Sequence, residues 1–228
     1  MKGVAHVLLL AVLTAGGREA TDMTEKLHWL GHDTFRIDGP PVVYVDPYQL
    51  GDGLPAADII LITHDHFDHL SPADVAKIHK PTTVVVAPKE VLGKLSFPVT
   101  VIAAGETKTV AGIPVRAVPA YNINKTFHPK GDGKVGFILT VGGVTYYHAG
   151  DTDVIPEMTG LAPDVALLPV SGTYVMTADE AAKAARQIKP KVAVPMHYGA
   201  IVGSDADARK FAKLLEGSGI QVVIKAKE

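Results

Sequence analysis

The chain contains the run Asp58-Ile59-Ile60-Leu61-Ile62-Thr63-His64-Asp65-His66-Phe67-Asp68-His69. The first half of this run is a short apolar segment, which is typical of a buried strand. The second half places three histidines and two aspartates within seven positions. Neutral imidazole and carboxylate groups are the ligands that zinc and similar divalent ions prefer in proteins. The run therefore predicts a metal site at the carboxyl end of a buried strand.

The spacing within this cluster predicts two directions of ligation. His64 and His66 are two positions apart, so in an extended stretch their side chains point the same way and could bind one ion together. Asp68 and His69 are adjacent, so they present their ligand atoms in a different direction and could serve a second ion. Asp65 lies on the other side of the histidine pair, where we expect it to support a ligand or to form a turn.

Two later polar positions also follow short apolar strands. Asp151 comes just after the β-like run Thr145-Tyr146-Tyr147, and Gly150 between them allows the backbone to turn sharply. His197 follows the apolar segment 191–196 in the same way. Polar clusters at several strand ends suggest one shared rim, which is where sites are assembled in layered α/β proteins.

The segment Thr63–His69 resembles the HxHxDH signature of the metallo-β-lactamase superfamily. His128, Asp151 and His197 stand in the order of the later motifs of that family, and the resemblance runs from about Leu27 to the C-terminus. It implies an α/β fold, the four-layer αβ/βα sandwich. In that fold two sheets pack face to face, helices cover the outside, and the metals lie at one edge.

The same resemblance implies how the ligands are divided between two divalent ions. The first ion would be held by His64, His66 and His128, and the second by Asp68, His69 and His197, with Asp151 between the two. His148 competes with His128 for its position, and the sequence leaves that choice open. Because the chain has no cysteine, thiolate ligation is excluded; we expect zinc, while manganese and iron stay open.

A narrower likeness lies in Trp29-Leu30-Gly31-His32 and Val45-Asp46-Pro47. These phrases are similar to the branch that includes ascorbate-6-phosphate lactonase and N-acyl phosphatidylethanolamine phospholipase D. The resemblance implies a hydrolase in which a hydroxide held between two metals attacks an ester, lactone or phosphodiester. His64, His66 and Asp68 would be its catalytic groups, with Asp68 orienting the nucleophile. Two other classes stay open: a di-iron redox or oxygen-handling protein, and a metal-stabilised binding protein without turnover.

Substrate contacts are predicted from residues near the ligands. Lys125 could pair with a phosphate or carboxylate of the substrate, and Tyr198 could hydrogen-bond a substrate oxygen. His32 could line the site or orient a ligand. None of these residues distinguishes a lactone from a phosphodiester.

The length of the chain predicts one domain, over residues 23–228, and the resemblance implies that this domain is a hydrolase of a small molecule. The formal charge of the 228-residue chain is −2 and it contains no polybasic run, which argues against a dedicated nucleic-acid binder. The apolar run 4–13 after Met1-Lys2 resembles a signal peptide and is too short for an ordinary transmembrane helix. We expect a leader over residues 1–22 and export; the alternative is a start at Met23 and a cytoplasmic protein.

Short β-rich segments dominate the first two thirds of the chain. We expect strands around residues 27–37, 42–45, 59–62, 83–87, 99–102, 107–119, 134–141 and 144–147. Helices are predicted at Pro72–His79 and Lys89–Leu95. Thr177-Ala178-Asp179-Glu180 predicts a capping box that opens a helix to about Ile188. A last helix would open between Ser204 and Asp207 and end near Gly217.

Overall fold

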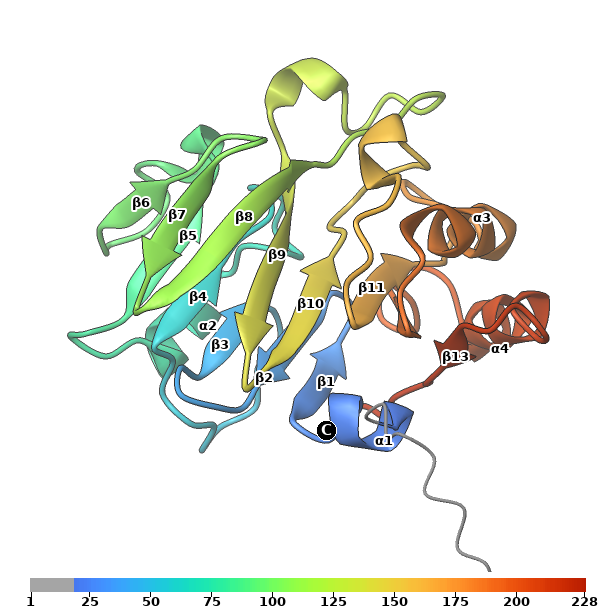
Figure 1. The fold of residues 1–228 in the computed structure, drawn as a ribbon. Coiled ribbons are helices and arrows are strands. Elements are labelled where there is room, and N and C mark those ends of the chain that lie inside the picture. The colour runs from blue at the N-terminus through green and yellow to red at the C-terminus, as the bar shows by residue number, and fades with distance from the viewer. Residues whose placement is uncertain (1–18) are drawn as a thin grey trace, which may run out of the picture.

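The computed structural model describes residues 19–228 as two β-sheets with helices outside them (Figure 1). The first sheet has its six strands in sequence order: β1 (Leu27–Gly31), β2 (Thr34–Ile37), β3 (Val43–Val45), β4 (Ile59–Leu61), β5 (Val84–Ala87) and β6 (Val99–Val101). The second sheet has the order β13-β12-β11-β10-β9-β8-β7. Its strands are β7 (Thr107–Val110), β8 (Ile113–Pro119), β9 (Val135–Val141), β10 (Val144–His148), β11 (Val165–Pro169), β12 (Val192–Met196) and β13 (Gln221–Val222). This architecture confirms the predicted α/β sandwich.

The apolar run at strand β4 contributes side chains to two hydrophobic core clusters, one on each face of the first sheet. Ile59 and Leu61 belong to the large core cluster, which contains residues of both sheets. Ile60 and Ile62 belong to a second cluster, together with residues of helix α2 (Pro72–Ile78). Because successive side chains of a strand point to opposite faces, a run that is apolar on both faces suits a strand buried between a sheet and a helix.

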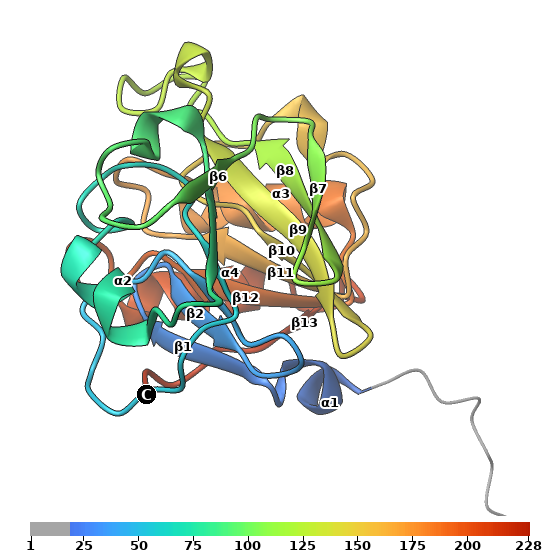
Figure 2. The same ribbon diagram turned by 90° about the vertical axis from the view of Figure 1, so that its left-hand side faces the viewer.

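The helices cover the outer faces. Figure 1 shows the strands between α2 on one side and the pair α3 (Ala178–Ile188) and α4 (Asp205–Leu214) on the other, and Figure 2 shows α2 from the side. The predicted capping box is confirmed at α3, where the Thr177 hydroxyl accepts from the backbone of Glu180 and the Glu180 carboxylate accepts from that of Thr177. Ser204 and Asp207 form the same motif at α4.

Strand direction gathers the polar clusters at one edge of the sandwich. β3, β4, β5 and β6 are mutually parallel, and so are β10, β11, β12 and β13. β1 runs with β3, and β8 runs with β10, since each pair is separated by one antiparallel strand. The carboxyl ends of strands that run the same way lie at the same edge. The segments that follow β1, β3, β4, β8, β10, β11 and β12 can therefore build one site.

Several predicted elements differ from the structure. The segment 27–37 is a hairpin rather than one strand, because Gly31 and His32 adopt positive φ angles of 108° and 51°. The segment 107–119 is broken in the same way at Ala111 and Gly112. The predicted helix Lys89–Leu95 was wrong. It is a single 3₁₀ turn, η1 (Lys89–Val91), which ends because Leu92 leaves helical backbone angles.

Three elements not yet named complete the chain. Two are 3₁₀ turns, η2 (Lys130–Asp132) and η3 (Pro156–Met158). The third is helix α1 (Ala20–Thr24), which the sequence did not predict. Met23 within α1 is buried in the large core cluster, and its carbonyl accepts a hydrogen bond from Tyr146. The signal-peptide segment, residues 1–17, lies outside the described residues.

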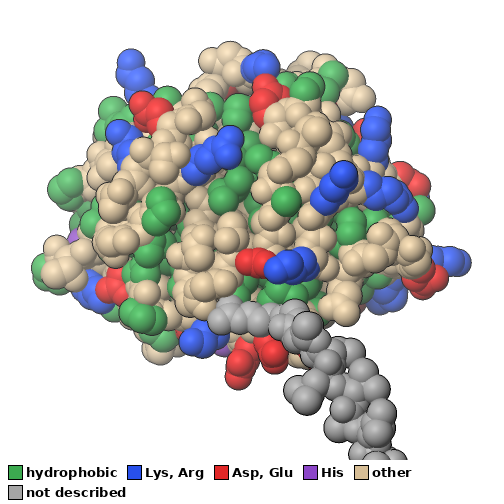
Figure 3. Space-filling model, viewed as in Figure 1, with side chains coloured by type: hydrophobic (Ala, Val, Ile, Leu, Met, Phe, Trp, Pro, Cys, Tyr) green, Lys and Arg blue, Asp and Glu red, His purple; other side chains and the backbone are tan. Residues whose placement is uncertain are grey.

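The surface carries charges of both signs. Figure 3 shows lysine, arginine, aspartate and glutamate side chains scattered over one face among hydrophobic and neutral ones. Within residues 19–228, no helix is both long enough and apolar enough to cross a membrane.

Candidate metal centre

Three imidazole rings, those of His64, His66 and His128, lie close together past the carboxyl end of β4. We call them the first ligand group. The Nε2 atom of His64 lies 3.0 Å from Nδ1 of His66, and Nε2 of His128 lies 3.2 Å from the same Nδ1. His64 and His66 come from the segment after β4, whereas His128 comes from the segment between β8 and β9. Three ring nitrogens this close to one another are a natural set of metal donors.

The far nitrogens of two of these rings are fixed by oxygen atoms. Nδ1–H of His128 donates to Oδ1 of Asn122 at 3.0 Å. Nδ1 of His64 lies 2.9 Å from the Thr63 hydroxyl, whose own proton goes to a carboxylate. Thr63 must therefore accept from His64. Both rings consequently keep the lone pair on Nε2, the atom that faces the cluster, which is the usual way that a metal-ligating histidine is oriented.

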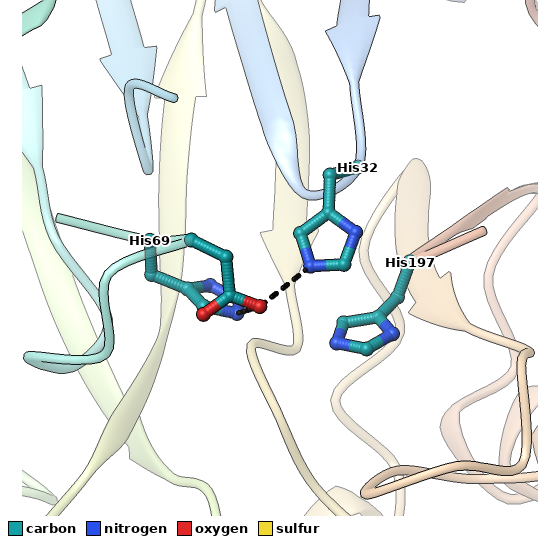
Figure 4. A group of neighbouring side chains, drawn as sticks. His32, His69 and His197 are labelled. Carbon is teal, nitrogen blue, oxygen red and sulfur yellow. Dashed lines mark hydrogen bonds and ion pairs between the residues drawn. The ribbon is translucent and has the colours of Figure 1, made fainter. Parts of the chain in front are cut away.

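The second ligand group lies beside the first, and its four residues come from the segments after β1, β4 and β12. The ligand atoms of His32, Asp68, His69 and His197 all lie within 4.8 Å of one another. Figure 4 shows the three rings around a common space, with the dashed line marking the 3.0 Å contact between His32 Nε2 and Asp68 Oδ2. Within residues 19–228, the buried Nε2 atoms of His69 and His197 have no hydrogen-bond partner. Buried ring nitrogens that have no hydrogen-bond partner at the centre of such a cluster are atoms that a metal ion would satisfy.

The far nitrogens of His69 and His197 are also fixed. Nδ1–H of His69 donates to Oδ2 of Asp46 at 2.8 Å. Nδ1 of His197 lies 3.0 Å from the hydroxyl of Ser171, which follows β11. These contacts again direct Nε2 toward the cluster, so the second group has the same built-in orientation as the first.

Asp151 connects the two groups. Its Oδ2 atom lies 3.3 Å from Nε2 of His128 in the first group and 3.4 Å from Nε2 of His197 in the second. Its Oδ1 atom lies 3.4 Å from Nε2 of His69 and has no hydrogen-bond donor among the described residues. A buried carboxylate that reaches both groups can serve as a ligand common to two ions.

Electrostatics differ between the two groups. Burial lowers the pKa of His64 well below its ordinary value and lowers the pKa of His128 to about 4. Burial acts the same way on His197, but the nearby Asp151 carboxylate outweighs it and raises the pKa to about 9. The first group is therefore neutral at pH 7 without a metal. Burial at His69 is likewise outweighed by the carboxylates of Asp151 and Asp46, which raise its pKa well above the ordinary value. In the second group, protons on His69 and His197 must therefore leave before their Nε2 atoms can bind an ion.

Asp33 is a buried acid that the sequence prediction missed. Both of its carboxylate oxygens lack a hydrogen-bond partner within residues 19–228, and Oδ2 lies 3.8 Å from Nδ1 of His69. Burial raises its pKa well above the ordinary value. Its ligand atom groups with those of His69, Asp151 and His197. The only signal in the sequence was a polar pair, His32-Asp33, between two strands.

The structure separates His148 from the ligand groups. Nε2–H of His148 donates to the carbonyl of Asp33 at 2.9 Å, and Nδ1 accepts from the backbone N–H of Gly150 at 3.2 Å. Both ring nitrogens are thus occupied. Of the two candidates that the sequence left open, the structure places His128 with His64 and His66, and His148 with Asp33 and Asp46.

The three residues predicted to contact the substrate have different surroundings in the structure. Lys125 is ion-paired with the buried carboxylate of Asp153. Tyr198 is buried and packs on Trp29, with ring centroids 4.8 Å apart. His32 lies among the ligand atoms of the second group. Asp65, expected to support a ligand or form a turn, is ion-paired with Lys94.

A cavity of about 410 Å³ opens over the two ligand groups. Its polar part is formed by His66, Asp68, His128 and Asp151, and its apolar part by Phe67, Phe127, Tyr174 and Ile201. Among the described residues, neither Lys125 nor Tyr198 lines it. A substrate in this cavity would lie directly against both groups.

This fold and this cluster define the class of the protein. The model of the beta-lactamase superfamily domain matches residues 26–197, so the chain belongs to that superfamily. Within it, the chain is a member of the UPF0173 metal-dependent hydrolases. It is 34% identical to one from Archaeoglobus fulgidus, with 87% of this chain and 94% of the relative covered. It is 36% identical to one from Methanoregula boonei, with 84% and 90% covered.

Solved structures agree with this assignment. The metallo hydrolase Igni18 of Ignicoccus hospitalis has a TM-score of 0.73 and 26% identity to this chain, with 88% of this chain and 94% of that chain covered. The chain is a metal-dependent hydrolase with histidine and aspartate groups that could bind metal.

Proposed function

We propose that this hydrolase cleaves an ester, lactone or phosphodiester bond with the help of two divalent ions. The observation that carries the proposal is the position of Asp151. Its two carboxylate oxygens lie 3.3 to 3.4 Å from Nε2 atoms of histidines in both ligand groups. The first ion would be held by His64, His66 and His128, and the second by Asp68, His69 and His197, with Asp151 shared. When bound, two such ions lower the pKa of a water toward neutrality and polarise the substrate oxygen.

In this proposal His32 orients a ligand, which is one of the two roles that the sequence left open for it. Its Nε2 atom lies 3.0 Å from Oδ2 of Asp68, and its ring centroid lies 4.1 Å from that of His197. At that position it can hold the Asp68 carboxylate or add a further nitrogen to the second ion. We therefore assign His32 to the metal centre rather than to the substrate.

Asp68 is the residue that we propose as the base. It lines the cavity and lies beside the second group at the same time. Burial alone would raise its pKa, but the bond from His32 and the charge of His69 lower it below the ordinary value. Asp68 is therefore ionised at neutral pH and can orient the attacking water and accept its proton.

The donor set favours zinc. Imidazole and carboxylate ligands without thiolate suit zinc, iron and manganese, and clusters rich in imidazole are typical of zinc hydrolases. Metal analysis of the purified protein would test this directly, with close to two ions per chain as the expected result.

Hydrolysis assays test the reaction class. Protein loaded separately with zinc and with manganese would be given bis-p-nitrophenyl phosphate, p-nitrophenyl esters and a panel of small lactones. Asp68→Asn should lower turnover by about 10²–10⁴-fold, because it removes a base at nearly constant shape. Asp65→Asn is the matched control. It belongs to the same motif but pairs with Lys94 and lies outside the ligand groups, so its turnover should match the parent protein. Equal loss in both variants, or no metal-dependent turnover with two ions bound, would contradict the proposal.

A further inference from the structure

Exposed hydrophobic side chains gather at the opening of the cavity over the two ligand groups. The large hydrophobic residues that are exposed within residues 19–228 are Phe67, Leu92, Ile123, Phe127, Tyr174, Ile201 and Ile224. Four of these seven, namely Phe67, Phe127, Tyr174 and Ile201, line this one cavity. Exposed apolar side chains that gather at one concave site usually mark a binding surface, whereas single ones need no explanation.

The four apolar residues come from four separate segments that converge there. Phe67 follows β4, Phe127 lies between β8 and β9, Tyr174 follows β11, and Ile201 follows β12. The rings of Phe127 and Tyr174 meet edge to face, with centroids 4.5 Å apart and planes at 78°. This is a favourable aromatic geometry, so Phe127 and Tyr174 support each other on one side of the cavity.

The side chain of Asn122 connects the apolar side of the cavity with the first ligand group. The Asn122 side-chain amide donates to the carbonyl of Tyr174 at 3.0 Å, and its oxygen accepts from Nδ1–H of His128 at 3.0 Å. Tyr174 itself has a positive φ of 67°, a conformation that is uncommon for a residue with a side chain. One buried amide therefore positions a ligand of the first group and a wall of the cavity together.

Among the described residues, no lysine or arginine side chain lines this cavity. The lysines of the nearby segment 120–134 are each paired with a carboxylate: Lys125 with Asp153, Lys130 with Glu157, and Lys134 with Glu90. An anionic phosphate would therefore meet no side-chain cation here beyond the metal ions, although a lysine or an arginine fork commonly assists in binding phosphate.

We propose that the substrate is a neutral ester or lactone with an aliphatic or aromatic group next to its carbonyl, held between Phe67, Phe127, Tyr174 and Ile201. This inference rests on the proposed hydrolysis at the metal centre, and it selects the uncharged carbonyl substrates within that class. The carbonyl would face the polar floor, and the apolar group would replace water at the mouth of the cavity.

A chain-length series tests the inference. With zinc-loaded protein, kcat/KM for p-nitrophenyl acetate, butyrate, hexanoate and octanoate should rise by about two- to fourfold per methylene. A fully buried methylene is worth about 0.8 kcal/mol, close to a fourfold change, and this cavity is open on one side. Bis-p-nitrophenyl phosphate should be the poorer substrate.

Two isoleucines of nearly equal exposure provide matched variants. Ile201 is 41% exposed and lines the cavity, whereas Ile224 is 43% exposed and lies elsewhere. Ile201→Ser should flatten the chain-length dependence, and Ile224→Ser should leave it unchanged. A flat series in the parent protein, a preference for the phosphodiester, or equal effects of the two variants would overturn the inference while leaving the hydrolase proposal intact.

A binding measurement keeps the test independent of turnover. Straight-chain hydroxamates from acetohydroxamate to octanohydroxamate place a metal-binding head before an apolar chain, and their affinity for the zinc-loaded protein can be measured by calorimetry. Affinity should rise with chain length in the parent protein and in Ile224→Ser, but much less in Ile201→Ser. If esters, lactones and the phosphodiester are all inert while this rise is seen, the proposed hydrolysis fails and the apolar site stands. If affinity does not depend on chain length, the inference is refuted.

Discussion

Asp46 is the residue at which a single atom exchange should disturb both ligand groups. Its carboxylate is fully buried; Oδ1 accepts from the backbone N–H of Thr63 at 2.7 Å. Oδ2 accepts from the Thr63 hydroxyl at 2.6 Å and from Nδ1–H of His69 at 2.8 Å. Thr63 in turn accepts from His64. Asp46→Asn keeps the shape but replaces one acceptor by an N–H donor, so at least one of these three donors must face another donor.

The size of the effect follows from these contacts. Loss of a partner that orients a metal-ligating histidine typically weakens metal binding 10–100-fold, which is about 1.4–2.7 kcal/mol. Because Asp46 holds His69 directly and His64 through Thr63, we expect this loss for both ions. The metal-free variant should also be about 1–3 kcal/mol less stable, since a buried donor is left unpaired.

Competition with a chromogenic zinc chelator measures both affinities, and thermal unfolding of the metal-free protein shows that the variant is folded. Asp58→Asn is the control, because that carboxylate accepts from the backbone of Val42 far from the ligand groups. Thr63→Val removes the hydroxyl that links Asp46 to His64 but keeps the hydrogen bond between His69 and Asp46, so the larger loss of affinity should fall on the first ion. Parent-like affinity for both ions in a folded Asp46→Asn protein would refute the reasoning.

Three further predictions concern protonation, packing and helix capping. Despite burial, Asp151 raises the pKa of His197 to about 9 and, together with Asp46, raises that of His69 well above its ordinary value. Binding of the second ion should therefore release protons at pH 7 and strengthen from pH 6 to 8; calorimetry in two buffers would show the release, and binding without it would contradict the prediction. Gly136→Ala should cost about 1–3 kcal/mol or more, because its Cβ would lie 2.5 Å from the carbonyl oxygen of His148; urea unfolding should separate it from Gly131→Ala, where nothing lies within 4 Å. Thr177→Ala removes the cap of α3 and should cost about 1 kcal/mol, or about 2–4 °C in Tm; an unchanged Tm would show that the cap is unimportant.

The ligands that are close together in sequence could be predicted without the structure. The segment Thr63–His69 contributes four of the side chains of the two groups. The apolar residues just before it predicted strand β4. Asp151 and His197 were found because each follows a strand end. These predictions rested on the periodicity of a strand and the donor preferences of divalent ions, together with the resemblance to the metallo-β-lactamase superfamily.

The supporting residues could not be found in this way. Asp33 and Asp46 both look like ordinary turn aspartates at strand ends, and their burial depends on how two sheets pack. Lys125 looked free to meet a substrate because its partner, Asp153, lies 28 positions away in sequence. Tyr198 follows a ligand directly, but the positive φ of His197, 60°, sets the backbone there and Tyr198 packs on Trp29.

The contacts of the histidines link metal affinity to the register of the sheets. His69 is held from the end of β3 and His197 from the end of β11, so each is oriented by a strand next to the one that it follows. A shift of one residue between β3 and β4 would turn Asp46 to the opposite face and leave His69 without its acceptor. The same shift would exchange the apolar faces of β4, so hydrophobic burial and ligand orientation specify one register together. The metal centre should therefore be preformed in the metal-free protein, and metal binding should raise its stability without changing its secondary structure.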